Sequence, residues 1–302
     1  MAELTRRRLL AGSLAATSGA ALLHSTVPHS HPWEAEAAQP HHGGDHAGGH
    51  ADFRDGRTVD HAANGFDPHE IVRDFDWGTT SRLAGGRVVR EWELYAVEQE
   101  IEVAPGVRFA AWSYNQRVPG PTLRCREGER LRITFINGSQ HPHTIHFHGI
   151  HPAEMDGVPG LGAGQIEPRG STVYEFDALP AGLHLYHCHV RPLAEHIAKG
   201  LYGAFIVDPK DGREDADELV RIYLVNVLEY DLINSFHLHG NLFDYYPTGT
   251  GTTPSELTDT VMLCQGQRGI LEWRFPHPGK YMFHAHQSEF TELGWQGFFE
   301  VS

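Results

Sequence analysis

The 302-residue sequence has little positive charge, few sulfur-containing residues and no long hydrophobic run. It contains 24 lysines and arginines against 39 acidic residues, and the net charge of −15 argues against a nucleic-acid or anionic-membrane partner, which would require a basic face. No run of about 18 or more apolar residues occurs, so no segment of the mature protein is expected to span a bilayer. Three cysteines are too few for a disulfide-dense scaffold.

Histidine, in contrast, is abundant, with 23 residues. Nine of them lie between His24 and His69, and fourteen lie between His141 and His286. Because histidine is the commonest metal ligand in proteins, the positions of these two groups indicate where metal chemistry is to be sought.

Residues 1–38 have the features of an export signal. Arg6, Arg7 and Arg8 precede a weakly apolar stretch, and an alanine-rich run follows. Paired arginines before a modest apolar region resemble a twin-arginine signal, so we expect a periplasmic or extracellular protein. Residues 39–87 have too few apolar groups to offset chain entropy. They are predicted to be a histidine-rich disordered tail or linker. This segment either binds metal adventitiously or is only a solvated linker.

From residue 88 onward the pattern predicts an all-β protein. Residues 130–136, 172–176 and 201–207 are short runs of β-branched, aromatic and alternating residues, separated by glycine, proline and aspartate. The pattern is that of a β-sandwich, and a single helical turn is expected near residues 193–199.

The chain also repeats itself. Residues 130–149 match residues 219–240, and residues 180–189 match residues 278–286. Two copies of one β unit predict two domains of one fold, at residues 88–210 and 211–302. The second copy has a much shorter stretch before its first histidine pair, so it is expected to lack the opening strands.

The repeats carry four His-x-His pairs. Successive side chains alternate across a strand, so each pair presents two imidazoles to the same side. Eight such imidazoles suit a cluster of borderline metals such as copper. The four pairs are His146/His148, His187/His189, His237/His239 and His284/His286.

Cys188 lies between the histidines of the second pair, so its thiol is expected to point to the opposite face. A thiolate joined by two imidazoles suits a blue-copper site. The two imidazoles expected there are those of His143, three residues before the first pair, and His196, eight residues after Cys188. Leu201 stands where such sites often have a weak axial methionine, which predicts a raised potential. The second copy has lost this site, because the corresponding positions hold Asn234, Ala285 and Phe290.

These motifs resemble those of the multicopper oxidases, in particular the two-domain, laccase-like bacterial branch with the type 1 copper in the first domain. The resemblance implies two cupredoxin-like Greek-key β-sandwich domains, the second one shortened. It also implies four coppers per chain, O2 reduction to water at a trinuclear cluster, and a homotrimer with that cluster between subunits.

The resemblance assigns a role to each copper ligand. The type 1 copper would have the ligands His143, Cys188 and His196, with non-coordinating Leu201 in the axial position. The type 2 copper would have His146 and His237. The type 3 pair would have His148, His187, His189, His239, His284 and His286.

The implied cycle takes single electrons from a donor, with His196 as the expected contact point. Phenols, aromatic amines and metal ions are the donors considered, and four methionines without a methionine-rich insert make cuprous-ion oxidation less favoured. Water formation requires protons, so a carboxylate is expected to act as a relay. The candidates are Asp156, Asp244, Asp259 and Glu289.

Two other functions fit parts of the pattern. A copper-containing nitrite reductase would share the two-domain trimer, but its catalytic copper needs three histidines rather than eight. A non-enzymatic copper-binding or electron-transfer protein would explain the histidine-rich tail but not the cluster. Cys125 and Cys264 are interpreted either as a disulfide or as two buried free thiols.

Overall fold

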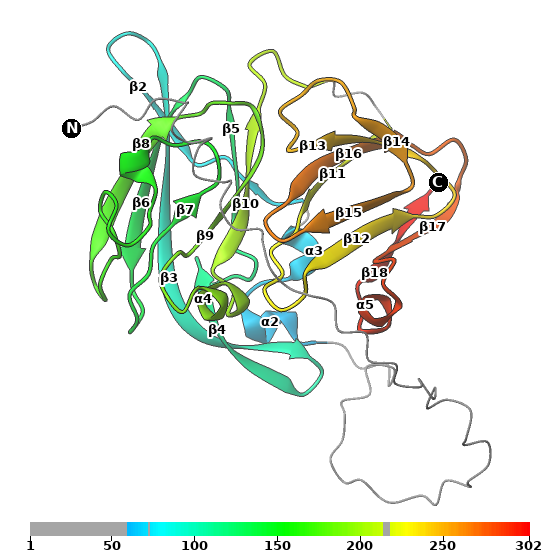
Figure 1. The fold of residues 1–302 in the computed structure, drawn as a ribbon, viewed down its shortest axis with the longest axis horizontal. Helices are drawn as coiled ribbons and strands as arrows, with labels where there is room; N and C mark the ends of the chain where they lie inside the picture. Colours follow the sequence, from blue (N-terminus) through cyan, green and yellow to red (C-terminus); the bar gives the residue numbers. More distant parts are fainter. Residues whose placement is uncertain (1–58, 72, 214–217) are drawn as a thin grey trace, which may run out of the picture. The chain divides into compact units, whose positions relative to one another are not determined.

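The first domain begins before residue 88. The computed structural model describes residues 59–71, 73–213 and 218–302 (Figure 1). Helices α2 (His61–Asn64) and α3 (Pro68–Ile71) and strands β1 (Phe75–Asp76) and β2 (Thr79–Arg82) precede the predicted boundary. The predicted export signal at residues 1–38 and most of the predicted histidine tail lie outside the described residues.

The prediction of disorder up to residue 87 is wrong for the described part of that stretch. β1 pairs in parallel with β5, and β2 pairs with β3. Asn64 exchanges side-chain hydrogen bonds with the backbone of Glu102. Phe75 packs edge-on against Tyr223 of the second domain, at a ring distance of 6.1 Å. These contacts depend on partners far along the chain, so local composition did not reveal them.

The first domain is a sandwich of two sheets. Its strands are β3 (Val88–Ala104), β4 (Val107–Tyr114), β5 (Thr122–Arg126), β6 (Arg130–Asn137), β7 (His146–Phe147), β8 (Ser171–Asp177), β9 (Gly182–His187) and β10 (Tyr202–Asp208). The outer sheet has the order β2-β3-β6-β8, with β4 on β3, and the inner sheet has the order β1-β5-β10-β9-β7. A 3-10 turn, η1 (Ala153–Met155), and helix α4 (Leu193–Ala198) lie in the connections. β6 alternates between half-buried and buried residues, as its sequence predicts, because one face lines the core.

The second domain repeats this plan with fewer strands. It contains β11 (Leu219–Val225), β12 (Ile233–Leu238), β13 (Phe243–Pro247), β14 (Glu256–Thr258), β15 (Thr260–Cys264), β16 (Arg268–Arg274), β17 (Gly279–His284), helix α5 (Ser288–Glu292) and β18 (Gln296–Val301). Its sheets have the orders β11-β16-β13-β14 and β15-β12-β17-β18. β6 pairs with both β3 and β8, whereas β11 pairs only with β16 among the described residues. The missing opening strands are therefore the counterparts of β3, β4 and β5.

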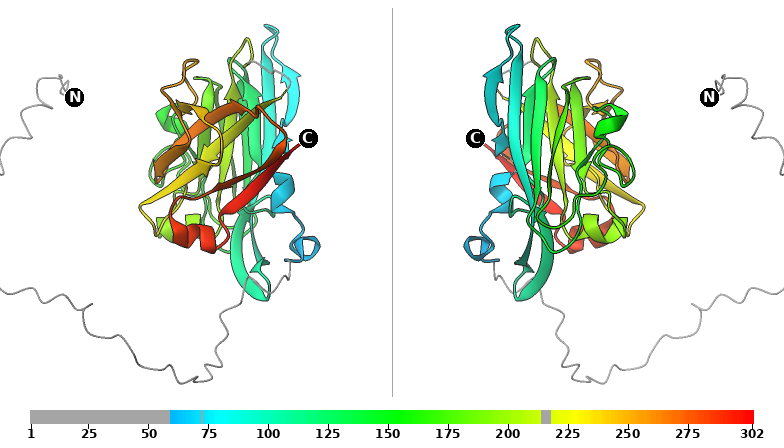
Figure 2. Two further views of the ribbon diagram at one scale, coloured as in Figure 1. Left: turned by 90° about the vertical axis from the view of Figure 1, so that its right-hand side faces the viewer. Right: turned by 90° about the vertical axis from the view of Figure 1, so that its left-hand side faces the viewer.

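The inner sheet of the first domain packs on the β11-β16-β13-β14 sheet of the second. Leu183, Ile206, Tyr246 and Ile270 form a buried cluster between them. The Arg268 side chain crosses this contact and donates to the Leu183 carbonyl at 2.6 Å. β9 is buried at every position because both of its faces are covered. The views in Figure 2 show the second domain in front from one side and the first domain in front from the other.

This architecture confirms the prediction of an all-β protein with two cupredoxin-like domains. None of the helices in the described part of the chain is long and apolar enough to cross a bilayer. Cys125 is buried and Cys264 is exposed, and both are free thiols. No disulfide therefore joins them within the chain, and the interpretation of two buried thiols holds only for Cys125.

Candidate metal centre

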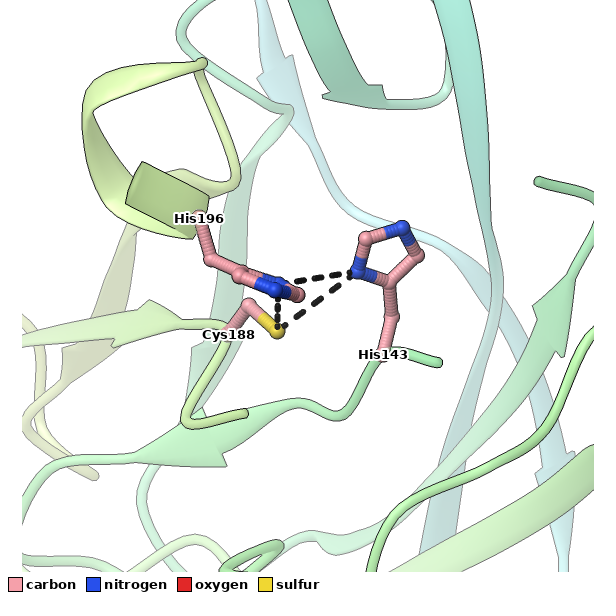
Figure 3. A group of neighbouring side chains, drawn as sticks. All are labelled: His143, Cys188 and His196. Carbon is pink, nitrogen blue, oxygen red and sulfur yellow. Dashed lines mark hydrogen bonds between the residues drawn. The ribbon is translucent and has the colours of Figure 1, made fainter. Parts of the chain in front are cut away.

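Three donor atoms converge near the end of β9 in the first domain. Cys188 directly follows β9, His143 lies between β6 and β7, and His196 lies in α4. The Cys188 Sγ atom is 3.2 Å from His196 Nδ1 and 3.8 Å from His143 Nδ1, and the two Nδ1 atoms are 3.1 Å apart. Figure 3 shows the sulfur and both imidazoles pointing toward one another. The predicted grouping of these three residues is confirmed.

The backbone around the triad is held by short connections. His143 and Ile166 exchange two backbone hydrogen bonds, which fix the segment that carries His143. After α4 the chain turns back at Gly200, where φ is 121° and a Cβ atom would lie 2.8 Å from the Trp112 carbonyl. Only glycine fits this turn. The turn lets buried Leu201 accept a hydrogen bond from the Cys188 N–H.

The triad is shielded from water, and this sets its protonation. Burial lowers the pKa of His143 to about 3, with further lowering from His196 and His141. Burial also lowers the pKa of His196. For Cys188, burial raises the pKa of the thiol, although hydrogen bonds that include one from the Thr144 N–H oppose this. Both imidazoles are therefore neutral and ready to act as ligands at neutral pH.

The donor set fits a single copper ion. Two nitrogen lone pairs and a sulfur face one another in a dry site, where a cation would compensate the buried thiolate. Two imidazoles and one thiolate are the ligands of blue-copper electron-transfer sites. The first domain therefore holds a type 1-like His2Cys site.

A first histidine quartet surrounds the end of β7 and β9. His146 is paired with His187 in the β7–β9 ladder, and His148 Nε2 lies 2.9 Å from His187 Nε2. His189 completes the quartet, with its ring 5.1 Å from that of His146. Burial lowers the pKa of His148 to about 3 and that of His187 to about 4. His148 and His187 are therefore also neutral at neutral pH.

A second quartet repeats this geometry in the second domain. His237 is paired with His284 in the β12–β17 ladder, and His239 Nε2 lies 2.9 Å from His284 Nε2. The ring of His286 is 5.2 Å from that of His237. The corresponding distances in the two quartets are nearly equal, because the sequence repeat places equivalent histidines at equivalent positions of the β7–β9 and β12–β17 ladders.

The two quartets are separate groups within one chain. In residues 59–71, 73–213 and 218–302, no cluster of three close metal-ligating atoms combines residues from both quartets. They also differ in exposure, since His187 is buried whereas His239 and His286 are exposed. Each quartet offers several imidazole nitrogens to metal.

The carboxylates predicted as proton relays have different surroundings. Asp156 Oδ1 is 2.9 Å from His146 Nδ1 and 3.4 Å from His151 Nε2. Gly157, with φ of 67°, allows this approach, because a Cβ atom there would lie 1.9 Å from the Ile145 carbonyl oxygen. The Asp259 carbonyl lies 3.0 Å from His237 Nδ1.

The other two carboxylates contact no histidine of the quartets. Asp244 is on β13 opposite Glu272, and Glu289 is exposed on α5.

The position of the lost type 1 site in the second domain is a cavity of about 370 Å³. The Ala285 N–H donates to the Trp295 carbonyl, as the Cys188 N–H does to Leu201. Without the cysteine and histidine ligands, the site has a largely apolar lining. Its walls are Leu228, Asn234, Phe290, Leu293, Gly294 and Trp295.

Two groups near the centre were missed by the sequence reasoning. The indole of Trp112 packs edge-on against His141, His143 and His196 at ring distances of 4.6, 5.3 and 4.8 Å. His184 is buried, with its two ring nitrogens 2.9 Å from the His148 and Pro180 carbonyl oxygens. No sequence motif pointed to Trp112. His184 could have been noticed because it lies three residues before His187 in the same strand, which is buried at every position.

Models of the multicopper oxidase family match residues 96–212 and 213–302. The chain belongs to the multicopper oxidase family. A multicopper oxidase with a known crystal structure is 57% identical to this chain in sequence, with a TM-score of 0.79, and the match covers 81% of this chain and 100% of that one. A blue copper oxidase from Nitrosomonas europaea is 25% identical, with a TM-score of 0.60, over 66% of this chain and 80% of that one.

Nitrite reductases are also similar to this multicopper oxidase. A copper-containing nitrite reductase from Neisseria meningitidis is 26% identical over 253 residues. The match covers 64% of this chain, and the chain spans 64% of the length of that relative.

Proposed function

We propose that this multicopper oxidase couples one-electron oxidation of a donor at the His143/Cys188/His196 site to four-electron reduction of O2 to water at a trinuclear site. The observation that carries the proposal is the covalent arrangement at the end of β9. Cys188 belongs to the type 1-like triad, and its chain neighbours His187 and His189 belong to the first quartet. The two sites are thus joined through a single stretch of backbone.

The trinuclear site is proposed to form between subunits of a homotrimer. Each chain supplies the two quartets as separate groups, and neither quartet alone provides eight imidazoles. Tyr230 and Leu232, close to the second quartet in sequence, are each 79% exposed, which is typical of an interaction surface. In this arrangement His146 and His237 hold the type 2 copper, and the other six histidines of the quartets hold the type 3 pair.

Copper bound at these residues would supply the redox chemistry in both half-reactions. In the first domain, burial favours the neutral form of His143, His148 and His187, hydrogen bonds of the second ring nitrogen fix the direction of imidazoles, and water is excluded from the triad. The His187 Nδ1 bond to the Cys188 carbonyl, at 2.8 Å, is one such restraint. Asp156 is the carboxylate proposed to deliver protons, since Oδ1 contacts both His146 and His151.

The subunit arrangement can be tested by mixing two inactive variants. His148→Ala damages the first quartet and His239→Ala damages the second. With sites between subunits, each mixed trimer has one of its three sites intact, so co-expression of the two variants in equal amounts regains about a quarter of the wild-type oxygen uptake overall. With sites inside one chain, every chain is damaged and the mixed trimers stay inactive. Each variant expressed alone is the control.

The reaction itself is tested by copper counting and oxygen uptake. Four coppers per chain and one O2 consumed for every four one-electron donors oxidised, with no peroxide released, would support the oxidase. Two coppers per chain with nitrite turnover would instead support the nitrite reductase alternative. This alternative is tested because a copper-containing nitrite reductase is 26% identical to the chain. Phenols, aromatic amines and Mn(II) are the donors to compare, and export by the signal at residues 1–38 is tested by finding the protein outside the cytoplasm.

A further inference from the structure

Neither imidazole of the type 1-like site offers a surface that a donor could contact. His143 is 0% exposed and His196 is 3% exposed. A donor was expected to contact His196, but almost none of the surface of that residue is accessible. Trp112 on β4 is 9% exposed and has a larger side chain. Trp112 is thus also largely buried, but it keeps slightly more exposed surface than either imidazole, and its indole packs against both.

Trp112 is fixed to the same connection that carries the copper ligand. The backbone N–H of Trp112 donates to the carbonyl of Lys199, just after α4, at 3.0 Å. The side chain of Lys199 in turn donates to the Ala110 carbonyl at 3.3 Å. β4 and the end of α4 are thereby tied together on both sides of the indole. The ring is held in one place relative to His196.

A positive charge lies beside the indole. The Lys199 ammonium is 5.0 Å from the Trp112 ring centroid and 6.0 Å from that of Phe109. A cation on the ring face is attracted to the neutral indole but would repel an indole that had lost an electron. Lys199 therefore makes Trp112 harder to oxidise, so that the ring conducts electrons without becoming a radical itself.

We propose that Trp112 is the residue that a small aromatic electron donor contacts, and that electrons reach the two imidazoles through its ring. The inference rests on the proposed function and specifies where its donor binds. Each donor molecule loses one electron, which reduces one copper(II) ion to copper(I). A phenolic donor also releases its proton to water, and the terminal oxidant is the O2 of the proposed reaction.

The test is anaerobic, so that it does not depend on oxygen reduction. Copper-loaded protein is mixed with hydroquinone in a stopped-flow instrument, and the loss of the blue absorption of the type 1 site is followed. The variants are Trp112→Phe and Trp112→Leu, with Trp273→Phe in the second-domain core as the matched control. The blue absorption, copper content and reduction potential of each variant are measured first, and rates are compared at equal driving force.

We expect Trp112→Leu to be reduced about tenfold more slowly, the size of effect typical when a group that supports a metal ligand is removed. Trp112→Phe should fall between it and the wild type, and Trp273→Phe should match the wild type. If Trp112→Leu does not hold type 1 copper, Trp112→Met replaces it, because methionine fills irregular space without a ring.

The inference is overturned if the leucine or methionine variant keeps its blue absorption and is reduced as fast as the wild type. A donor would then contact His196 directly. Normal anaerobic reduction through Trp112 without any oxygen uptake would refute the proposed oxidase function while leaving the donor contact in place. The two failures are therefore distinguishable.

Lys199→Met provides an independent measurement. We expect it to keep the blue absorption but to yield a tryptophan radical signal by electron paramagnetic resonance when the protein is treated with a strong oxidant. The wild type should give a much weaker signal under the same treatment. Equal signals in both proteins would show that the ammonium does not protect the indole and would overturn this part of the inference.

Discussion

Acidification of the copper-free protein to about pH 5.5 should lower its free energy of unfolding substantially, because buried histidines resist protonation. His143, His148 and His187 have pKa values lowered from the usual 6.5 to about 3, about 3 and about 4, and burial is the main cause in each case. In the unfolded chain each regains an ordinary pKa. Above pH 6.5 neither state binds the proton, so these histidines do not affect stability there.

Between pH 6.5 and the lowered values, only the unfolded state binds these protons, so stability falls as the pH falls. At about pH 5.5 each unfolded imidazole is roughly ten to one protonated, which is worth about 1.4 kcal/mol per histidine. The three together remove about 4 kcal/mol, a large share of the roughly 5–15 kcal/mol that holds a domain folded. Burial also lowers the pKa values of His146, His184 and His196, and these add to the effect in the same direction.

The assay is urea unfolding of the copper-free protein at about pH 7.5 and about pH 5.5, at constant salt and protein concentration. His143→Asn is the matched control, because asparagine occupies the corresponding position, Asn234, in the second domain. This variant should lose about 1.4 kcal/mol of the pH dependence, which is a third of the contribution of His143, His148 and His187. The reasoning is refuted if the wild type changes by less than about 1 kcal/mol, or if the variant keeps the whole pH dependence.

Three further predictions concern single positions. Leu201→Met should lower the potential of the type 1 copper, since the thioether can act as a weak axial ligand, while changing stability by less than about 1.5 kcal/mol; an unchanged potential in a redox titration would contradict it. Asp156→Asn should slow oxygen reduction about a hundredfold but leave anaerobic reduction of the blue site unchanged; equal slowing of both steps would rule out a proton-delivery role. Arg124 forms a two-point ion pair with Asp208, at 2.8 and 3.1 Å, so Arg124→Met should lower the stability by about 3 kcal/mol in urea unfolding. Asp208→Asn, which keeps one acceptor oxygen, should cost less, and an equal loss would contradict the charge argument.

Much of the metal centre could be predicted because it is encoded locally. A His-x-His pair on a strand places both imidazoles on one side whatever the rest of the fold does. The repeat of this spacing explains why His146 faces His187 and His237 faces His284 in equivalent ladders. Cys188 could be assigned to the blue site because the same period separates its thiol from its histidine neighbours.

Other features depend on how distant segments pack and have no local pattern. Trp112 reaches the copper ligands only because β4 meets the end of α4, more than eighty residues later in the chain. The structure of residues 61–71 and 73–82 likewise depends on distant partners, which include β3, β5 and Tyr223. The shortened second domain was visible in the sequence, but the identity of the missing strands required the strand order of both domains.

From the sequence alone, the kind of chemistry could be determined: the histidine spacing and Cys188 specify copper ligands, and the repeat specifies two related domains. Only the tertiary structure decided that the two quartets remain apart within one chain, that both type 1 imidazoles are buried, and that an indole covers them. The physical reason is that ligand type and strand period are local properties, whereas burial and the meeting of surfaces are set by long-range packing.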